Sequence, residues 1–143
     1  MADSVTKAQR SRIMAAVKSK NTTPELKVRR LLHRLGYRFR LHVKSLPGSP
    51  DIVLPRLHKI IEVHGCFWHG HDCGGCRIPQ TRRDYWVAKI DRNRRRGCST
   101  IRKLNSAGWT VLVVWECEIQ QVVSLTKLLQ RFLATSKPKS RRI

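Results

Sequence analysis

The chain has 143 residues, with 30 lysines and arginines against 9 aspartates and glutamates, and its formal net charge is +21. This length fits one domain with a real core, and no apolar run approaches the roughly 20 residues that cross a bilayer. Positive charge in this excess predicts a polyanionic partner, and we expect nucleic acid rather than a membrane. The first residues contain no apolar signal region, so we expect a cytoplasmic protein.

The N-terminal part of the sequence predicts a basic segment followed by a helix. Residues 1–20 are either a short basic helix lying on DNA or a solvated, half-ordered terminus. Thr22 has the character of an N-cap, Glu25 follows three residues later, and Gly36 suits the position after the last turn. Taken alone, Glu25 is expected to be a capping carboxylate.

Strand patterns follow the helix. Residues 37–43 alternate apolar and basic side chains, as in a half-buried strand with a positive outer face. Residues 51–54 and 59–64 are expected to form a hairpin around a turn at 55–58. This hairpin would place Asp51, at the start of one strand, near Glu62, at the end of the next.

The C-terminal half predicts a long basic helix over 81–105, which Gly97 should interrupt, then a buried central strand over 110–115 and a helix over 119–134. Residues 136–143 are expected to be a disordered basic tail. The predicted architecture is α/β, a single domain over 21–135 with a mixed sheet flanked by helices in the order α-β-β-β-α-β-α.

Two carboxylates on adjacent strands can hold Mg²⁺, which prefers oxygen ligands. Asp51, Glu62 and the backbone carbonyl of Val63 are the candidates, and His64 or His69 could deprotonate a metal-bound water. The alternative is structural: Asp51 would cap a turn and Glu62 would lie on an exposed strand face.

A second cluster contains thiols and a histidine. Cys66, His71, Cys73 and the distant Cys117 would give the S₃N set that structural zinc prefers. Cys76 could replace His71, and the sequence does not decide between them. The alternative is a set of buried free cysteines with a solvated histidine.

Aromatic and basic residues beside these clusters suggest contact with DNA. Phe67 and Trp68 adjoin His69, and Trp86 opens the basic helix, so the three could act as a wedge between base pairs. Trp109 and Trp115 are expected in the core. The arginines expected on phosphates are Arg92, Arg94, Arg95 and Arg96.

The pattern Pro50-Asp51, then Glu62-Val63-His64, resembles the PD-(D/E)xK nuclease motif with histidine in place of lysine. Together with the stretch GCFWHGHDC at 65–73 and VWEC at 114–117, the chain resembles the very short patch repair (Vsr) endonucleases from about Lys7 through Cys117. The resemblance implies a restriction-endonuclease-like fold with a structural zinc. It also implies a Mg²⁺-dependent nick on the 5′ side of the thymine in a T·G mismatch, which starts repair of deaminated 5-methylcytosine.

The resemblance also implies roles for individual residues. Asp51 would be the central Mg²⁺ ligand, joined by the Val63 carbonyl, with His69 as general base, His64 assisting at the phosphate and Glu25 as an outer partner. Glu62 is a departure, because some Vsr enzymes lack a carboxylate there, and it makes Glu62 a further expected ligand. The zinc ligands would be the cysteine and histidine set above, and Phe67, Trp68 and Trp86 would intercalate, with Met14 as a further DNA contact.

Three functions therefore compete at this point. The first is a Vsr-type mismatch nickase, working as a monomer in the bacterial nucleoid and passing its product to repair proteins. The second is a non-catalytic, zinc-containing DNA-binding protein. The third is a Vsr-like nuclease with another target, such as a restriction or RNA-processing enzyme.

Overall fold

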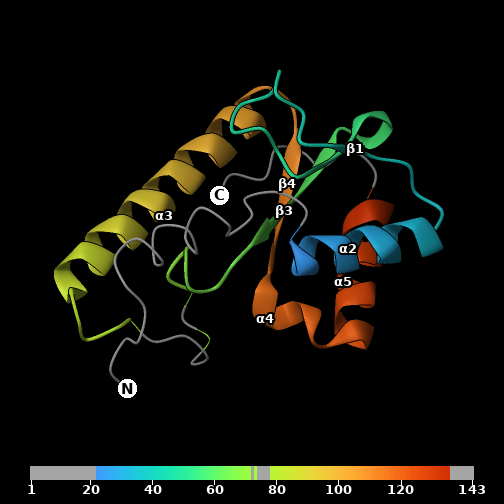
Figure 1. Ribbon diagram of the computed structural model, residues 1–143. Coiled ribbons are helices and arrows are strands. Elements are labelled where there is room, and N and C mark those ends of the chain that lie inside the picture. The colour runs from blue at the N-terminus through green and yellow to red at the C-terminus, as the bar shows by residue number, and fades with distance from the viewer. Residues whose placement is uncertain (1–21, 72, 74–77, 136–143) are drawn as a thin grey trace.

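The computed structural model describes residues 22–71, 73 and 78–135, which form a four-stranded open sheet between helices (Figure 1). The helices are α2 (Thr23–Arg34), α3 (Arg83–Ser106), α4 (Glu116–Ile119) and α5 (Val122–Ala134), with a 3-10 turn over Pro55–Leu57. The strands are β1 (Arg40–Leu41), β2 (Ile52–Leu54), β3 (Lys59–His64) and β4 (Thr110–Trp115). Within the described residues, no helix is both long and apolar enough to span a bilayer.

The sheet is mixed, and its strands lie in the order β1-β2-β3-β4. β1, β2 and β3 form an antiparallel meander, in which Ile52 faces Ile61. β4 returns through α3 and pairs in parallel with β3, so that His64 faces Trp115. The carboxyl ends of β3 and β4 therefore lie side by side at one end of the sheet. The residues of the carboxylate and thiol clusters predicted from the sequence lie in and after these strand ends.

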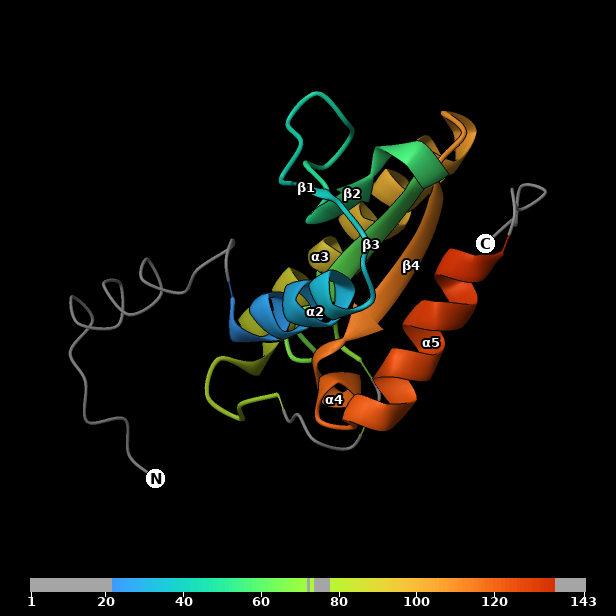
Figure 2. The ribbon, with the colours of Figure 1, turned by 90° about the vertical axis from the view of Figure 1, so that its right-hand side faces the viewer.

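Alternating residues of the strands fill two separate cores. On one face, Ile52, Leu54 and Ile61 pack with apolar residues of α2 and α5. On the other face, Val53 and Ile60 pack with Leu104 of α3. Figure 2 shows α3 behind the sheet and α2 in front of it. A sheet covered on both faces explains the nearly continuous apolar runs in β2 and β3.

The predicted mixed sheet with flanking helices is confirmed, but four details of the prediction were wrong. The expected strand over 37–43 shortens to β1, which pairs only through Arg40 and Leu41, and the left-handed conformation of His42, with φ of 46°, ends it on the C-terminal side. α3 runs unbroken through Gly97. β4 is an edge strand rather than a central one. The helix expected over 119–134 is divided into α4 and α5, because Gln121, with φ of −104° and ψ of 79°, lies outside helical geometry.

Candidate active site

The hairpin brings together the two carboxylates that the sequence singles out. β2 and β3 are antiparallel and pair Ile52 with Ile61, so Asp51 and Glu62 are the next residues along the ladder. Asp51 Oδ2 accepts a hydrogen bond from the backbone N–H of Val63 at 2.9 Å. This bond holds the Asp51 carboxylate against the end of β3.

The electrostatics of this pair favour a cation. Burial raises the pKa of Asp51 to about 6, and burial together with the nearby Asp51 charge raises the pKa of Glu62 to about 9. Glu62 Oε1 is buried and has no hydrogen-bond partner among the described residues. Two crowded carboxylates with an unsatisfied oxygen match the needs of a hard divalent ion, which would reverse both pKa shifts.

His64 and His69 form a stacked pair beside the carboxylates. Their ring centroids are 3.9 Å apart and the rings are inclined by 7°. Burial, with a further contribution from His69, lowers the pKa of His64 to about 4, and burial also lowers the pKa of His69. At neutral pH both imidazoles are therefore uncharged, and each retains a nitrogen that can accept a proton.

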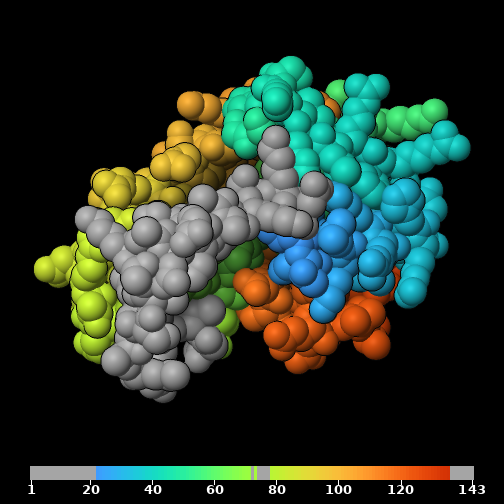
Figure 3. All heavy atoms as spheres, in the orientation of Figure 1, coloured from blue at the N-terminus to red at the C-terminus, as the bar shows by residue number. Residues whose placement is uncertain are grey.

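These groups line one cavity of about 600 Å³. Its walls come from the start of α2, the carboxyl end of β3 and the inner face of α3. Residues 42–50 appear at the surface between α3 and α2 in Figure 3, and in this segment the tight turn at Gly48 packs against Thr100 of α3. The predicted residues among the lining are Asp51, Glu62, Val63, His64, Trp68, His69 and Arg96.

Glu25 does not line the cavity, but its buried side chain lies beside that of Asp51. Thr22 Oγ1 accepts from the backbone N–H of Glu25 at 3.3 Å, as predicted for an N-cap. The Glu25 carboxylate instead accepts from Arg29 Nη2 at 2.5 Å and lies 2.8 Å from His42 Nε2. The expected reciprocal capping by Glu25 is therefore replaced by these two contacts.

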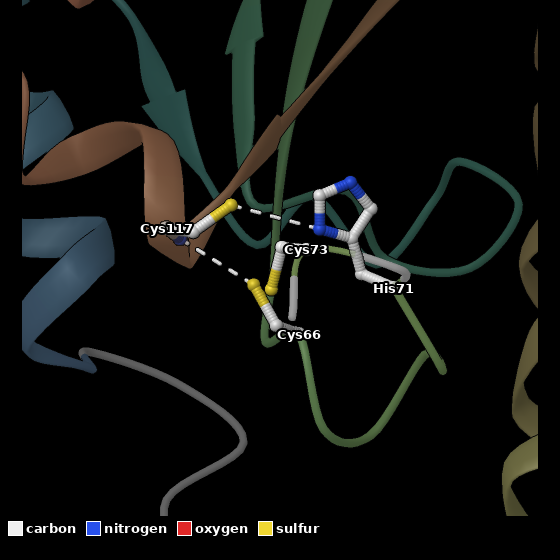
Figure 4. A group of neighbouring side chains, drawn as sticks. All are labelled: Cys66, His71, Cys73 and Cys117. Atoms are coloured by element: carbon white, nitrogen blue, oxygen red, sulfur yellow. Dashed lines mark hydrogen bonds between the residues drawn. The ribbon is translucent and has the colours of Figure 1, made fainter. Parts of the chain in front are cut away.

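The thiol cluster is assembled as predicted from the loop after β3 and the start of α4. Cys66, His71, Cys73 and Cys117 point toward one another (Figure 4), and their ligand atoms all lie within 4.8 Å of one another. Cys117 donates its backbone N–H to Cys66 Sγ at 3.4 Å, and its Sγ is 3.6 Å from His71 Nδ1. Burial, with the Cys66 and Cys73 thiols, raises the pKa of Cys117 to about 12. Three thiols and one imidazole at this spacing could hold a metal ion.

The predicted wedge residues form a contiguous aromatic cluster. Phe67 contacts Trp68 and Trp86 edge to face, at centroid distances of 5.2 and 5.5 Å. Tyr85 adds a further edge contact to Trp86. The cluster flanks the histidine pair, since Trp68 also lines the cavity. The four predicted phosphate-contacting arginines, Arg92, Arg94, Arg95 and Arg96, are all exposed on α3.

Comparisons with known proteins agree with this arrangement. A family model described as DNA mismatch endonuclease Vsr matches residues 2–75. The type II nicking enzyme V.XorIIP of Xanthomonas oryzae pv. oryzae is 48% identical over 136 residues, covering 95% of this chain and 100% of that protein. The DNA mismatch endonuclease Vsr of Escherichia coli is 41% identical over 126 residues, covering 88% of this chain and 81% of that protein. The type II nicking enzyme V.NmeAIP of Neisseria meningitidis is 38% identical over 137 residues, covering 96% and 98%.

The chain belongs to the Vsr family. It is accordingly a DNA endonuclease, and the non-catalytic DNA-binding protein that composition alone allows is excluded. The family resemblance stated from the sequence is confirmed. DNA is the substrate of this Vsr protein, which accounts for its net charge of +21.

Four residues of this Vsr site were not found by sequence reasoning. Trp115, assigned to the core, stacks on His71 at 4.0 Å and contacts His64 edge to face at 5.3 Å. Asn93 donates to the Trp68 carbonyl at 3.0 Å. Gly97 lies where a Cβ would be 3.8 Å from His64 and 3.9 Å from His69. The fourth is His42, which the alternating pattern assigned to the outer face of a strand, although its side chain contacts Glu25.

Some predicted features of this Vsr chain lie outside the described residues. They are the N-terminal segment with Met14, the alternative ligand Cys76 and the C-terminal tail.

Proposed function

We propose that this Vsr endonuclease nicks double-stranded DNA on the 5′ side of the thymine in a T·G mismatch, by Mg²⁺-dependent hydrolysis, and so starts very short patch repair. The observation that carries the proposal is the cavity in which Asp51 and Glu62 lie beside the stacked His64 and His69. Metal-dependent hydrolysis of a phosphodiester uses a cation site together with a general base within reach of the attacking water. The E. coli relative is named a mismatch endonuclease.

The residues fit a Mg²⁺ ion. Asp51 and Glu62 would hold it, with the Val63 carbonyl as a third oxygen donor, and the unpaired Glu62 Oε1 is the atom that gains most from a cation. When bound, Mg²⁺ polarises the phosphodiester and lowers the pKa of a bound water. The Val63 N–H bond to Asp51 Oδ2 keeps one carboxylate oxygen oriented before any ion arrives.

His69 acts as the general base in this proposal, and His64 assists at the phosphate. Burial keeps both imidazoles neutral, so that a lone pair is available to take the water proton. Parallel stacking at 3.9 Å means that a proton on one ring disfavours a proton on the other. The pair is therefore suited to receive a single proton in each catalytic cycle.

The thiol cluster is proposed to hold a structural Zn²⁺ through Cys66, His71, Cys73 and Cys117. Its S₃N donor set and its spacing suit tetrahedral zinc. The ion would connect the loop that carries His69 to the start of α4, which directly follows β4.

Mismatch preference is proposed to arise from Phe67, Trp68 and Trp86. Inserting these rings between base pairs requires unstacking at a cost of a few kcal/mol per step, which is least where pairing is already faulty. The second candidate is a nick at another target, since several relatives are named type II nicking enzymes.

The test compares a duplex carrying one T·G mismatch with its fully paired counterpart, each with Mg²⁺ or EDTA. We expect a Mg²⁺-dependent nick beside the thymine of the mismatched duplex only. Asp51→Asn should abolish it, while Asp91→Asn, a matched change on the exposed face of α3, should retain it. Equal cutting of both duplexes would remove the mismatch role, and cutting in EDTA would overturn the metal mechanism.

A further inference from the structure

The carboxylate of Glu25 is held between two basic side chains beside Asp51. Its side chain is only 3% exposed, and its oxygens contact Arg29 on one side and His42 on the other. Arg29 comes from the same helix one turn later, whereas His42 follows β1, seventeen residues along the chain. A buried carboxylate needs such partners, because removing it from water without them is costly.

His42 also contacts Asp51 directly. The backbone N–H of His42 donates to the Asp51 carbonyl at 3.2 Å. The ligand atoms of Glu25, His42 and Asp51 all lie within 4.8 Å of one another. His42 therefore connects α2 to the residue that precedes β2. Its backbone binds the main chain of Asp51, and its side chain contacts the carboxylate of Glu25.

The left-handed conformation at His42 makes this double contact possible. With φ of 46°, the chain turns out of β1 immediately after Leu41, while its backbone N–H still faces Asp51. Non-glycine residues rarely adopt this conformation, and it costs of order 1 kcal/mol or more where it occurs. The hydrogen bonds at both ends of His42 offset that cost.

The hydrogen bond decides which role His42 has. An ionised carboxylate, such as one paired with arginine, accepts hydrogen bonds and cannot donate them. In the 2.8 Å contact with Glu25, Nε2 serves as the donor when it carries the imidazole proton, and it then has no lone pair to offer a metal. Without this contact, the closeness of Glu25, His42 and Asp51 would suggest that His42 is itself a metal ligand.

We propose that His42, together with Arg29, is a positioning residue that sets Glu25 against Asp51 and thereby pre-forms the cation site. The proposal rests on the proposed Mg²⁺-dependent function. Arg29 offsets part of the Glu25 charge, which would otherwise add to the repulsion at Asp51 and Glu62. His42 fixes the direction of the Glu25 oxygens and the position of the Asp51 backbone. Outer partners of this kind typically change metal affinity or activity about 10- to 100-fold when removed.

The test uses His42→Leu, which removes the donor, and His42→Gln, which returns an N–H donor near the position of Nε2. His33→Gln is the matched control, because His33 is exposed in the last turn of α2. Three quantities are measured for each variant: the Mg²⁺ concentration for half-maximal single-turnover nicking, the rise in Tm on adding Mg²⁺, and DNA affinity without added Mg²⁺.

We expect His42→Leu to raise the required Mg²⁺ concentration about 10- to 100-fold and to reduce the Mg²⁺-induced rise in Tm, with unchanged DNA affinity without added Mg²⁺. His42→Gln should restore most of both quantities, and His33→Gln should match the wild type. A His42→Leu variant with wild-type Mg²⁺ dependence would overturn the proposal, and so would a His42→Gln variant as impaired as His42→Leu.

A second pair keeps the proposal testable if His42→Leu does not fold. Arg29→Gln should also raise the required Mg²⁺ concentration, whereas Arg30→Gln, on the exposed side of the same helix, should not. Equal behaviour of the two variants would overturn the proposal. Failure of the proposed function itself would look different, because the wild-type protein would then nick without Mg²⁺ or not nick at all.

Discussion

Two clusters of side chains lie near the carboxyl ends of β3 and β4, and they offer different kinds of metal ligand. The thiol cluster gathers soft ligands whose four ligand atoms face one another. The carboxylate site presents hard oxygens and two neutral histidines to a cavity of about 600 Å³. A closed set of four ligands suits a structural ion, and an open site suits one that must meet a substrate. In the proposed division of roles, an ion in the thiol cluster stabilises the loop that carries His69.

Trp115 is the physical link between the two clusters. Its ring stacks on His71 of the thiol cluster at 4.0 Å, and it meets His64 and His69 edge to face at 5.3 and 6.1 Å. Because β4 carries Trp115 and leads directly to Cys117, one strand end supports both sites. A disturbance of the thiol cluster should therefore reach the histidines, whereas a disturbance of the carboxylates need not reach the thiols.

The largest expected effect is the loss of stability when a ligand of the thiol cluster is removed. Cys117→Ser should lower the free energy of unfolding by roughly 4 kcal/mol or more, as expected for loss of a structural metal ligand. Nicking should be lost with it, because the loop carrying His69 loses its anchor. Thermal unfolding and nicking are measured together, and Cys98→Ser, at an exposed position of α3, is the control. A stable and active Cys117→Ser protein would separate the thiol cluster from both the fold and the chemistry.

Filling the cavity should affect activity without affecting the fold. Gly97→Leu places a large side chain over His64 and His69, and we expect nicking to fall about 100-fold, the scale of small misplacements in an active site. Gly97→Ala adds only a Cβ at ordinary contact distance from both rings. It should keep activity and stabilise α3 by up to about 1 kcal/mol. Stopped-flow nicking and Tm distinguish the two, and full activity of Gly97→Leu would show that substrate does not enter here.

The buried carboxylate of Glu62 should make the stability of the protein depend on pH. Its pKa is raised from the ordinary 4.5 to about 9 in the fold, so without added Mg²⁺ the free energy of unfolding should fall as pH rises from about 4.5 to about 9. Glu62→Gln removes this loss and should be more stable than the wild type at pH 8 without added Mg²⁺ by roughly 1–3 kcal/mol. Mg²⁺ should stabilise the wild type and stabilise Glu62→Gln less. A Glu62→Gln protein that is less stable at pH 8 without added Mg²⁺ would contradict the account.

The smallest effect concerns a single phosphate contact on α3. Arg92→Gln should weaken binding to mismatched and paired duplexes alike, and it should reduce the salt slope of log affinity by about 1. Neither Tm nor the Mg²⁺ requirement should change, since Arg92 is exposed and is neither a lining residue of the cavity nor a member of the thiol cluster. Fluorescence titrations over a range of salt concentrations measure the slope. A selective loss on the mismatched duplex would instead assign Arg92 to mismatch recognition.

The predictable parts of the site depend on local sequence. The hairpin follows from two short apolar runs around a turn, and it alone brings Asp51 to Glu62. The ligand types in the loop 66–73 point to a metal without further help. Cys117 was found because the family resemblance joined it to that loop across more than forty residues.

The unpredicted parts depend on tertiary contact. The role of His42 arises where α2 meets the connection from β1 to β2, and no alternation pattern reports such a contact. Gly97 was expected to break α3, as its helix propensity indicates, but packing against the sheet keeps the helix continuous, and the missing side chain leaves room beside the histidines. Trp115 looks apolar in sequence, and only the parallel pairing of β4 with β3 places it between the clusters.

The central claim is that the thiol cluster stabilises the protein while Asp51 and its neighbours perform Mg²⁺-dependent nicking. The most direct test measures zinc content and nicking of a T·G duplex on the same preparations of wild type and Asp51→Asn, over a range of Mg²⁺ concentrations. We predict one zinc per chain in both proteins, and a Mg²⁺-dependent nick in the wild type alone. An Asp51→Asn protein that still nicks, or that has lost its zinc, would contradict the division of labour between the two sites.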